Sequence, residues 1–375
     1  MGGDVHLRVA PRAASRPTEI RLGDGALAGL MPHVSGMFPR AGRVLFVFDA
    51  GVVPSIERLG SWGAIIDPLG AADALKGRKA TLFLPGGEAS KTREVHARIE
   101  DAILKAEFTR DDAVVAIGGG AVLDVAGYAA ATARRGVPWV AVPTSVVAIA
   151  DASVGGKTAI NHPLGKNLLG AFHPPALVIA DVRTLSTLPA RDFAAGLAEV
   201  YKAGVIGDSS ILATLRAGVP RAGAALVDLL ARAIRVKITL VEADERDEGA
   251  RRALNYGHTV GHALETAMGP DAMRHGEGVA IGMGVAAEIA RARGRVPEGF
   301  VVRQDADLAA FGLPSRVPRS ADGARVREIV QTDKKRRPGG AHTMVLPRSD
   351  GGVDVVEDVT TSELDAALDA RLASR

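Results

Sequence analysis

Cysteine is absent from this sequence of 375 residues, and aromatic residues make up only 4% of it. Without cysteine, disulfide bonds and thiolate metal sites are excluded, so any transition metal must be held by His, Asp or Glu. The scarcity of aromatic side chains argues against binding of nucleic acid by base stacking. No apolar run is long enough to span a bilayer, and the N-terminus lacks the apolar core of a secretory signal. We therefore expect a soluble, cytoplasmic protein that binds neither nucleic acid nor membrane.

An excess of charge of one sign is also lacking, since the formal net charge is only +3. The densest cationic cluster is the short run Lys334-Lys335-Arg336-Arg337. A solvated loop explains such a run, and an anion site is the alternative interpretation. No basic arm or arginine-rich helix suggests a nucleic-acid partner.

The pattern of apolar residues predicts two domains, which the length also favours. In the first half, short apolar runs alternate with helical patterns such as residues 92–106 and 122–134. This alternation predicts a Rossmann-like α/β domain with a parallel sheet, at residues 1–183. Its predicted strands are residues 43–48, 81–84, 113–117, 139–142 and 176–180.

The second half lacks this alternation of strand and helix patterns and predicts a mainly α-helical domain at residues 184–375. Residues 189–293 have few β-like runs, whereas residues 343–346 and 353–356 flank a turn and predict a hairpin. The last helix is expected at residues 362–372, with Ser362 as its N-cap.

Gly118-Gly119-Gly120 indicates a nucleotide site, because it follows a predicted strand and precedes a helix. Glycines there let the backbone approach a pyrophosphate at the helix N-terminus. The G-x-G-x-x-G spacing is not met, since residue 123 is Leu, and a tight structural turn is the alternative. Asp124 either favours the helix dipole or contacts a nicotinamide. Glu88 and Lys91, beside a second glycine turn, either reach ribose hydroxyls or are solvated.

Three histidines indicate a metal site. His258 and His262 share one helix face, and His275 follows closely. Glu199 interrupts an otherwise apolar helix, where an unpaired carboxylate would be costly unless it bound a metal. A catalytic zinc site takes three protein ligands, but spacing does not say which two histidines would be ligands. The third would position a ligand or carry a proton.

The segment 154–167 predicts an anion pocket, because it is rich in glycine and amides and contains Lys157 and Lys166. It is not a P-loop, and a surface loop would have a similar composition. It lies between apolar segments, however, where lysines favour an anionic partner. Arg251, seven residues before His258, adds a cation near the predicted metal. These residues suggest a substrate with a phosphate or carboxylate group.

Taken together, these motifs resemble those of the 3-dehydroquinate synthase family over roughly residues 40 to 350. The resemblance rests on these segments: Gly118-Gly119-Gly120 with Asp124, Pro143-Thr144, residues 154–167, Gly196-Leu197-Ala198-Glu199, residues 254–262, and His275-Gly276-Glu277.

The resemblance implies an enzyme that converts 3-deoxy-D-arabino-heptulosonate 7-phosphate to 3-dehydroquinate and phosphate, in the shikimate pathway of aromatic amino acid biosynthesis. The implied course is metal-assisted oxidation by NAD, phosphate elimination, re-reduction and intramolecular aldol closure. NAD and a divalent metal, Zn²⁺ or Co²⁺, are the implied cofactors. The implied domain roles are NAD binding for residues 1–183 and metal and substrate binding for residues 184–375.

Carried over residue by residue, the resemblance makes Glu199, His258 and His275 the metal ligands. It implies cofactor contacts by Asp49, Glu88, Lys91, Gly119, Gly120, Asp124, Thr144, Ser145, Asp151, Lys157, Lys166, Thr184, Leu185 and Thr187. It implies substrate contacts by Arg135, Asp151, Lys157, Asn167, Lys202, Lys237, Arg251, Asn255, His262, His275 and either Lys334 or Lys335. Of the substrate contacts, the implied catalytic residues are Lys157, Lys202, Lys237, Arg251, Asn255 and His262. Arg135 would reach in from a neighbouring subunit, which implies a homodimer.

Three departures from the family pattern stand out. Ser145 replaces an expected Thr and keeps the hydroxyl, whereas Ile149 replaces an expected Gln and removes a polar contact near the cofactor. Gly278 stands where Ala is usual and looks neutral. Alternative functions are a related cyclase acting on sedoheptulose 7-phosphate, a metal- and NAD-dependent polyol-phosphate dehydrogenase, and a non-catalytic NAD-binding or scaffold protein.

Overall fold

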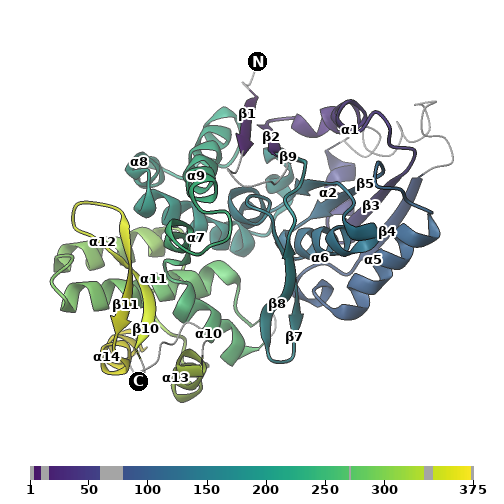
Figure 1. Cartoon of the computed structure of the whole chain (residues 1–375). Helices are drawn as coiled ribbons and strands as arrows, with labels where there is room; N and C mark the ends of the chain where they lie inside the picture. Colours follow the sequence, from purple (N-terminus) through teal and green to yellow (C-terminus); the bar gives the residue numbers. More distant parts are fainter. Residues whose placement is uncertain (1–3, 10–16, 60–78, 270–271, 333–340, 373–375) are drawn as a thin grey trace. The chain divides into compact units, whose positions relative to one another are not determined.

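The computed structural model describes residues 4–9, 17–59, 79–269, 272–332 and 341–372. The chain divides into two compact units (Figure 1). The first unit consists of Met1–Leu188 and Pro220–Arg246, and the second consists of Pro189–Val219 and Asp247–Arg375. No helix in these described ranges has the length and hydropathy that a membrane span needs.

A seven-stranded sheet is the centre of the first unit, with strand order β1-β2-β9-β6-β5-β3-β4. Only β1 and β2 pair antiparallel, and every other pairing in this sheet is parallel. The strands are β1 (Val5–Val9), β2 (Thr18–Gly23), β3 (Val44–Asp49), β4 (Lys79–Leu84), β5 (Ala113–Gly118), β6 (Trp139–Pro143) and β9 (Leu177–Asp181). The five predicted strands are therefore confirmed as β3, β4, β5, β6 and β9, whereas β1 and β2 were not predicted.

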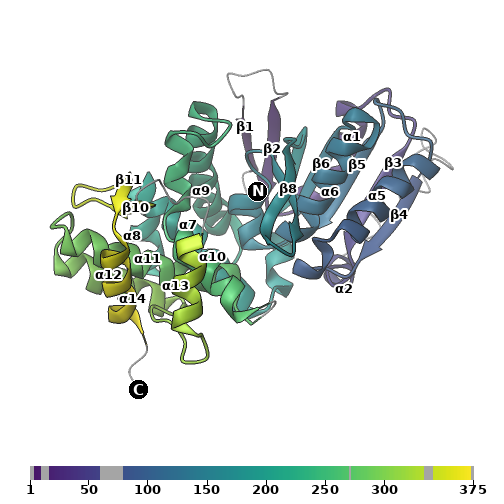
Figure 2. The ribbon, with the colours of Figure 1, turned by 60° about the horizontal axis from the view of Figure 1, so that its bottom comes forward.

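Both faces of this sheet are covered, which explains why its central strands are apolar at every position. Helices α5 (Arg93–Lys105) and α6 (Gly120–Thr132) lie side by side on one face (Figure 2). Side chains of η1 (Ala26–Gly29) and α1 (Leu30–Met37) join a buried cluster on the strands that contains Phe46 and Phe48. The described part of this unit also contains short helices, which are α2 (Val53–Arg58), η3 (Glu88–Ser90), η4 (Ala133–Arg135), η5 (Ala148–Ala152) and η6 (Val182–Thr187).

A separate two-stranded hairpin, β7 (Lys157–His162) and β8 (Gly165–Phe172), contains most of the segment predicted as an anion pocket. The segment is therefore a hairpin rather than an irregular loop. Gly170 permits the close pairing of the strands, because a Cβ there would lie 2.1 Å from the carbonyl oxygen of Thr158.

Helix α9 (Gly223–Ala243) packs on β1 and β2 and so belongs to the first unit, although the chain has already passed through the second. The sequence places a single boundary near residue 183, before this helix. That division into two sequence-continuous domains stays a prediction.

The second unit is mainly helical, as predicted. Its helices are α7 (Ala190–Ile206), α8 (Ser209–Ala217), η7 (Ala250–Asn255), α10 (His258–Met268), α11 (His275–Ala292), α12 (Glu298–Ala310), α13 (Gly323–Thr332) and α14 (Thr361–Arg371). The predicted hairpin is confirmed as β10 (His342–Pro347) and β11 (Val353–Val359).

The predicted N-cap of the last helix is wrong by two residues. Thr360, not Ser362, caps α14, because its hydroxyl accepts a hydrogen bond from the backbone N–H of Glu363 at 3.2 Å. The Glu363 carboxylate in turn accepts one from the backbone N–H of Thr360 at 2.8 Å. This reciprocal capping box satisfies two backbone donors, which Ser362 would not do.

Candidate active site

The carboxyl ends of the parallel strands bring Asp49 and the predicted glycine turns together. The Asp49 carboxylate, at the end of β3, accepts a hydrogen bond from the Gly51 N–H at 2.9 Å. Burial raises the pKa of the Asp49 carboxyl group, although hydrogen bonds from the backbone N–H groups of Gly51 and Gly119 oppose this effect. Gly86 has a φ of 79°, a left-handed conformation that favours glycine, and a Cβ there would also lie 2.4 Å from a side-chain oxygen of Asp49. Gly119 and Gly120 lie where α6 begins, so their backbone N–H groups fit the predicted pyrophosphate site.

Lys91 is buried rather than solvated, since only 4% of its side chain is exposed. Its ammonium contacts the carboxylate of Asp124 at 2.5 Å and the side-chain oxygen of Asn167. Burial raises the pKa of Asp124, and Lys91 opposes that effect. Asn161 donates a 2.6 Å hydrogen bond to Glu88, so the hairpin is tied to the second glycine turn. The structure thus brings together four predicted contact residues of the cofactor and substrate.

The other predicted cofactor residues of the first unit lie near strand ends. Thr144 is buried, and its N–H donates to the carbonyl of Gly118 at 3.0 Å. Lys157 is exposed at the start of β7, and Lys166 is half-buried in β8. The remaining three, Thr184, Leu185 and Thr187, lie in η6, and the first two of them are buried.

Two predicted substrate residues of the first unit form a pair. The Lys237 ammonium, from α9, contacts the Asp151 carboxylate at 2.7 Å and donates to the Asp151 backbone carbonyl at 2.5 Å. Lys237 is 7% exposed, so this pair holds a cation at the end of η5. Arg135, by contrast, is exposed and has a positive φ of 63°.

In the second unit, glycines let three helices approach closely. A Cβ on Gly276, in α11, would lie 1.7 Å from the carbonyl oxygen of Ala195 in α7. A Cβ on Gly282 would lie 1.9 Å from the carbonyl oxygen of Gly257, directly before α10. Larger residues at these positions would push the helices apart. Backbone contact of α11 with α7 and α10 is what places His275 beside the side chains of the other two helices.

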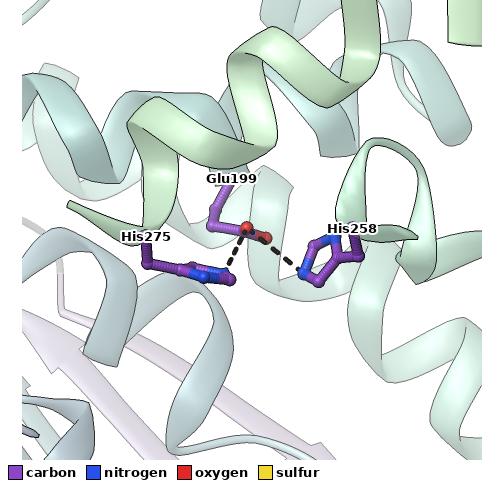
Figure 3. A group of neighbouring side chains, drawn as sticks. All are labelled: Glu199, His258 and His275. Atoms are coloured by element: carbon purple, nitrogen blue, oxygen red, sulfur yellow. Dashed lines mark ion pairs between the residues drawn. The ribbon is translucent and has the colours of Figure 1, made fainter. Parts of the chain in front are cut away.

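Glu199, His258 and His275 meet where these helices approach one another (Figure 3). A Glu199 oxygen lies 3.4 Å from His275 Nε2 and 3.8 Å from His258 Nε2. Glu199 is 3% exposed, and neither of its oxygens has a hydrogen bond of good geometry within the described residues, although Lys202 lies in ion-pair contact. A buried carboxylate between two imidazoles with unsatisfied oxygens suits a divalent cation, so these residues fit the predicted metal.

The charges around this cluster show how strongly it attracts cations. Burial raises the pKa of Glu199, but Lys202 and His275 outweigh burial and lower it to about 2. Burial lowers the pKa of His275, but Glu265 and Glu199 outweigh it and raise it to about 10. Two buried carboxylates therefore stabilise positive charge on the ring between them. A bound metal would replace a proton there.

Glu265, a buried residue of α10, also belongs to the site, although the sequence did not predict it. Its carboxylate lies 2.8 Å from His275 Nδ1. With His262 and His275 it forms a second group whose donor atoms lie within 4.8 Å of one another. The only sequence signal was an acidic residue three positions after His262 in an apolar helix.

His262 lies next to both other histidines, since its ring centroid is 5.2 Å from that of His258 and 5.8 Å from that of His275. Arg251 is buried and Asn255 is half-buried, and both belong to η7, which ends shortly before His258. Lys334 and Lys335 lie outside the described residues.

Comparison with known proteins identifies the family. Residues 81–195 match the family 3-dehydroquinate synthase N-terminal, and residues 196–336 match 3-dehydroquinate synthase C-terminal. A 3-dehydroquinate synthase of Geobacter metallireducens is 42% identical over 356 residues, which cover 93% of this chain and 95% of the relative. One from Synechococcus sp. is 45% identical over 77% of this chain and 80% of its own length. The chain belongs to the 3-dehydroquinate synthase family.

Solved structures of other enzymes share the fold of this family member. A 2-epi-5-epi-valiolone synthase of Streptomyces hygroscopicus subsp. jinggangensis, solved with NAD⁺ and Zn²⁺ bound, superposes with a TM-score of 0.83. It is 27% identical, with coverage of 96% of this chain and 98% of that one. A 2-deoxy-scyllo-inosose synthase has a TM-score of 0.84 at 24% identity, over 98% of this chain and all of the other, and so shares the fold.

The structure shows the surroundings of the three residues that depart from the family pattern, Ser145, Ile149 and Gly278. Ile149 is buried in η5, where a polar side chain would need a partner. The Ser145 hydroxyl accepts a hydrogen bond from the Ala148 N–H at 3.2 Å. Gly278 faces Gly261, and a Cβ there would lie 3.0 Å from that residue's carbonyl oxygen. Alanine at residue 278 would therefore make a tight contact that a small shift of α10 relieves.

Proposed function

We propose that this protein is a 3-dehydroquinate synthase, which converts 3-deoxy-D-arabino-heptulosonate 7-phosphate to 3-dehydroquinate and phosphate with catalytic NAD and a divalent metal. The observation that carries the proposal is the convergence of the buried Glu199 and His258 with the half-buried His275 in a chain of this family. In the reaction, the substrate alcohol is oxidised, phosphate leaves, the ketone is reduced again, and an aldol step closes the ring.

The chain's own residues supply a metal site and a nucleotide site. Glu199, His258 and His275 would hold the metal, which when bound acts as a Lewis acid and lowers the pKa of a bound alcohol. The glycine turn after β5, with Asp49 and the buried Asp124, would hold NAD, which accepts and returns a hydride. Lys91, by pairing with Asp124, opposes the effect of burial on that carboxyl group and fixes its position.

Cationic side chains are provided for an anionic substrate. In the first unit these are Lys157, Lys166 and Lys237, and in the second they are Lys202 and Arg251. Preorganised cations stabilise charge that develops as phosphate leaves and as the aldol step proceeds. Lys202 already lies against the carboxylate of Glu199, so a bound metal would free its ammonium for the substrate.

His262 is the proposed proton carrier. It lies beside the two ligand histidines, both of which contact the Glu199 carboxylate. An imidazole side chain can both take and give a proton, which suits this role. The departing phosphate can itself take the proton that its elimination releases, so no strong protein base is required.

Phosphate release tests the reaction. The purified protein would receive the heptulosonate phosphate, Zn²⁺ and a trace of NAD, and both phosphate and NADH would be followed. We expect many phosphates per NAD and no net NADH. Stoichiometric NADH would instead indicate a dehydrogenase, and release from sedoheptulose 7-phosphate alone would indicate the rival cyclase. His258→Ala is expected to lose both zinc and activity.

We also propose a homodimer in which the exposed Arg135 acts on the neighbouring subunit's substrate. Mixing Arg135→Ala with His258→Ala tests this, because a mixed dimer would regain one intact site. After full subunit exchange, about a quarter of the wild-type activity is expected. Two inactive variants that stay inactive together, although they exchange subunits, would contradict the proposal. The cytoplasmic location stays a prediction.

A further inference from the structure

Glu265 is a buried carboxylate for which the proposed reaction has no use. It lies in α10, one helical turn after His262 and two after His258, and is 5% exposed. Burying a carboxylate is costly unless a cation or hydrogen-bond donor satisfies it. Its partner is His275, whose Nδ1 lies 2.8 Å from the Glu265 oxygen Oε1.

The two ring nitrogens of His275 face different carboxylates. Nδ1 faces Glu265 at 2.8 Å, and Nε2 faces Glu199 at 3.4 Å. A neutral imidazole has one N–H, and a hydrogen bond to a carboxylate requires that N–H to point at it. When a metal replaces the second proton of the ring, the shorter contact would keep the N–H on Nδ1 and leave the Nε2 lone pair, on the side of Glu199, for the metal.

His258 has the same arrangement with a different acceptor. Its Nδ1 lies 3.3 Å from the backbone carbonyl oxygen of Tyr256, and its Nε2 faces the same Glu199 oxygen at 3.8 Å. A carbonyl oxygen only accepts, so Nδ1 again carries the hydrogen. Both histidines thus present Nε2 to Glu199, each held from behind by an acceptor at Nδ1.

We propose that Glu265 is a positioning residue, which accepts the Nδ1–H of His275 and fixes the ring orientation and tautomer that present Nε2 to the metal. The inference rests on the proposed metal site. It assigns Glu265 to a supporting role, although Glu265, His262 and His275 also lie close enough to form a donor group. A carboxylate behind a ligand histidine also makes that imidazole a stronger ligand.

Metal affinity is the measurement that separates this role from a purely structural one. Zn²⁺ binding to metal-free protein would be measured by competition with a chromophoric chelator, beside thermal unfolding of the metal-free protein. Glu265→Ala removes both the acceptor and the charge, and we expect about a 10- to 100-fold loss of zinc affinity. Glu265→Gln keeps an acceptor oxygen of similar shape, and we expect a smaller loss.

Glu277→Gln is the matched control. Glu277 lies two residues after His275 in the same helix, but its carboxylate pairs with Arg191 at 2.6 Å and accepts from the Arg274 N–H at 2.9 Å. It belongs to neither donor group within the described residues. We expect this variant to unfold at a lower temperature than the wild type while its zinc affinity changes less than twofold.

The outcomes are distinct. If Glu265→Ala unfolds early but binds zinc like the wild type, the residue is structural and the proposal is overturned. If that variant does not fold, Glu265→Gln decides, because wild-type zinc affinity and an unchanged Co²⁺ absorption spectrum would count against positioning, and altered values would support it. Failure of the proposed function can be told apart from failure of this proposal. In that case the wild-type protein would bind zinc at Glu199 but would release no phosphate.

Discussion

Replacing Gly276 with alanine tests whether close helix contact assembles the metal centre. The added Cβ would lie 1.7 Å from the carbonyl oxygen of Ala195, and that oxygen belongs to backbone, which cannot rotate away as a side chain can. Cβ atoms essentially never come within 3.0 Å of such an atom. The start of α11 must therefore recede from α7 by about 1.3 Å, the difference between these two distances.

This displacement acts directly on the metal ligands, because His275 precedes Gly276 and Glu199 lies one turn after Ala195. His275 Nε2 and the Glu199 oxygen, now 3.4 Å apart, would separate. Metal–ligand distances tolerate deviations of only about 0.2 Å, so a shift of this size removes one ligand. We expect at least a 10-fold loss of zinc affinity, and overpacking should lower the free energy of unfolding by about 1–3 kcal/mol.

Gly278→Ala provides the control for this prediction. It adds the same methyl group two residues later in α11, but the new Cβ lies 3.0 Å from the Gly261 carbonyl, a contact that a shift of tenths of an ångström relieves. We expect near-normal zinc affinity and unfolding temperature. Chelator competition and thermal unfolding measure both variants. Wild-type zinc binding by Gly276→Ala would refute the reasoning that the approach of α11 to α7 builds the site.

Three further predictions concern charge and metal. Lys91→Met strands the buried Asp124, and we expect a loss of about 3 kcal/mol in urea unfolding, which Lys91→Met with Asp124→Asn should largely restore. A double variant as unstable as the single one would contradict this. The Arg293 hydrogen bond lowers the pKa of Glu363 to about 2, so its stabilisation is complete above the ordinary carboxyl pKa and is lost as pH falls toward 2. Glu363→Gln should then cost about 1 kcal/mol at pH 7 and nothing near pH 2, as followed by urea unfolding at each pH, whereas a constant difference would exclude this linkage. Removing zinc should lower the wild-type unfolding temperature, and adding it back at 100 times its dissociation constant should restore about 2.7 kcal/mol. Glu199→Gln should show no such zinc response in the same thermal assay, and a full response would remove Glu199 from the ligand set.

The strands and helices that the sequence predicted are those with strong local patterns. β3, β5 and β6 are nearly continuous apolar runs, glycine follows β3 and β5 closely, and proline ends β6. β1 and β2 were missed because they alternate polar and apolar residues over short spans, and β9, through which β2 joins the rest of the sheet, lies far along the chain. The place of α9 could not be predicted, since α9 follows helices of the second unit in the sequence and only tertiary packing places it on β1 and β2.

The metal cluster was predicted because rare residue types gather in a short segment, whereas its supporting contacts are tertiary. The spacing of His258 and His262 left the ligand pair open, and the structure brings His258 and His275 to Glu199. Glu265 looks like an ordinary helical acid until α10 packs against α11. Likewise, the burial of Lys91 depends on a hairpin that composition alone did not predict.

The second unit therefore couples its stability to its chemistry through a few backbone contacts. Gly276 and Gly282 allow α11 to touch α7 and α10, and the same helix begins with His275. Alanine at either glycine would improve the helix propensity of α11 in isolation by roughly 1 kcal/mol, yet it would destroy the approach that the metal requires. Sequence features that weaken a helix locally are thus the features that place its first residue within reach of Glu199.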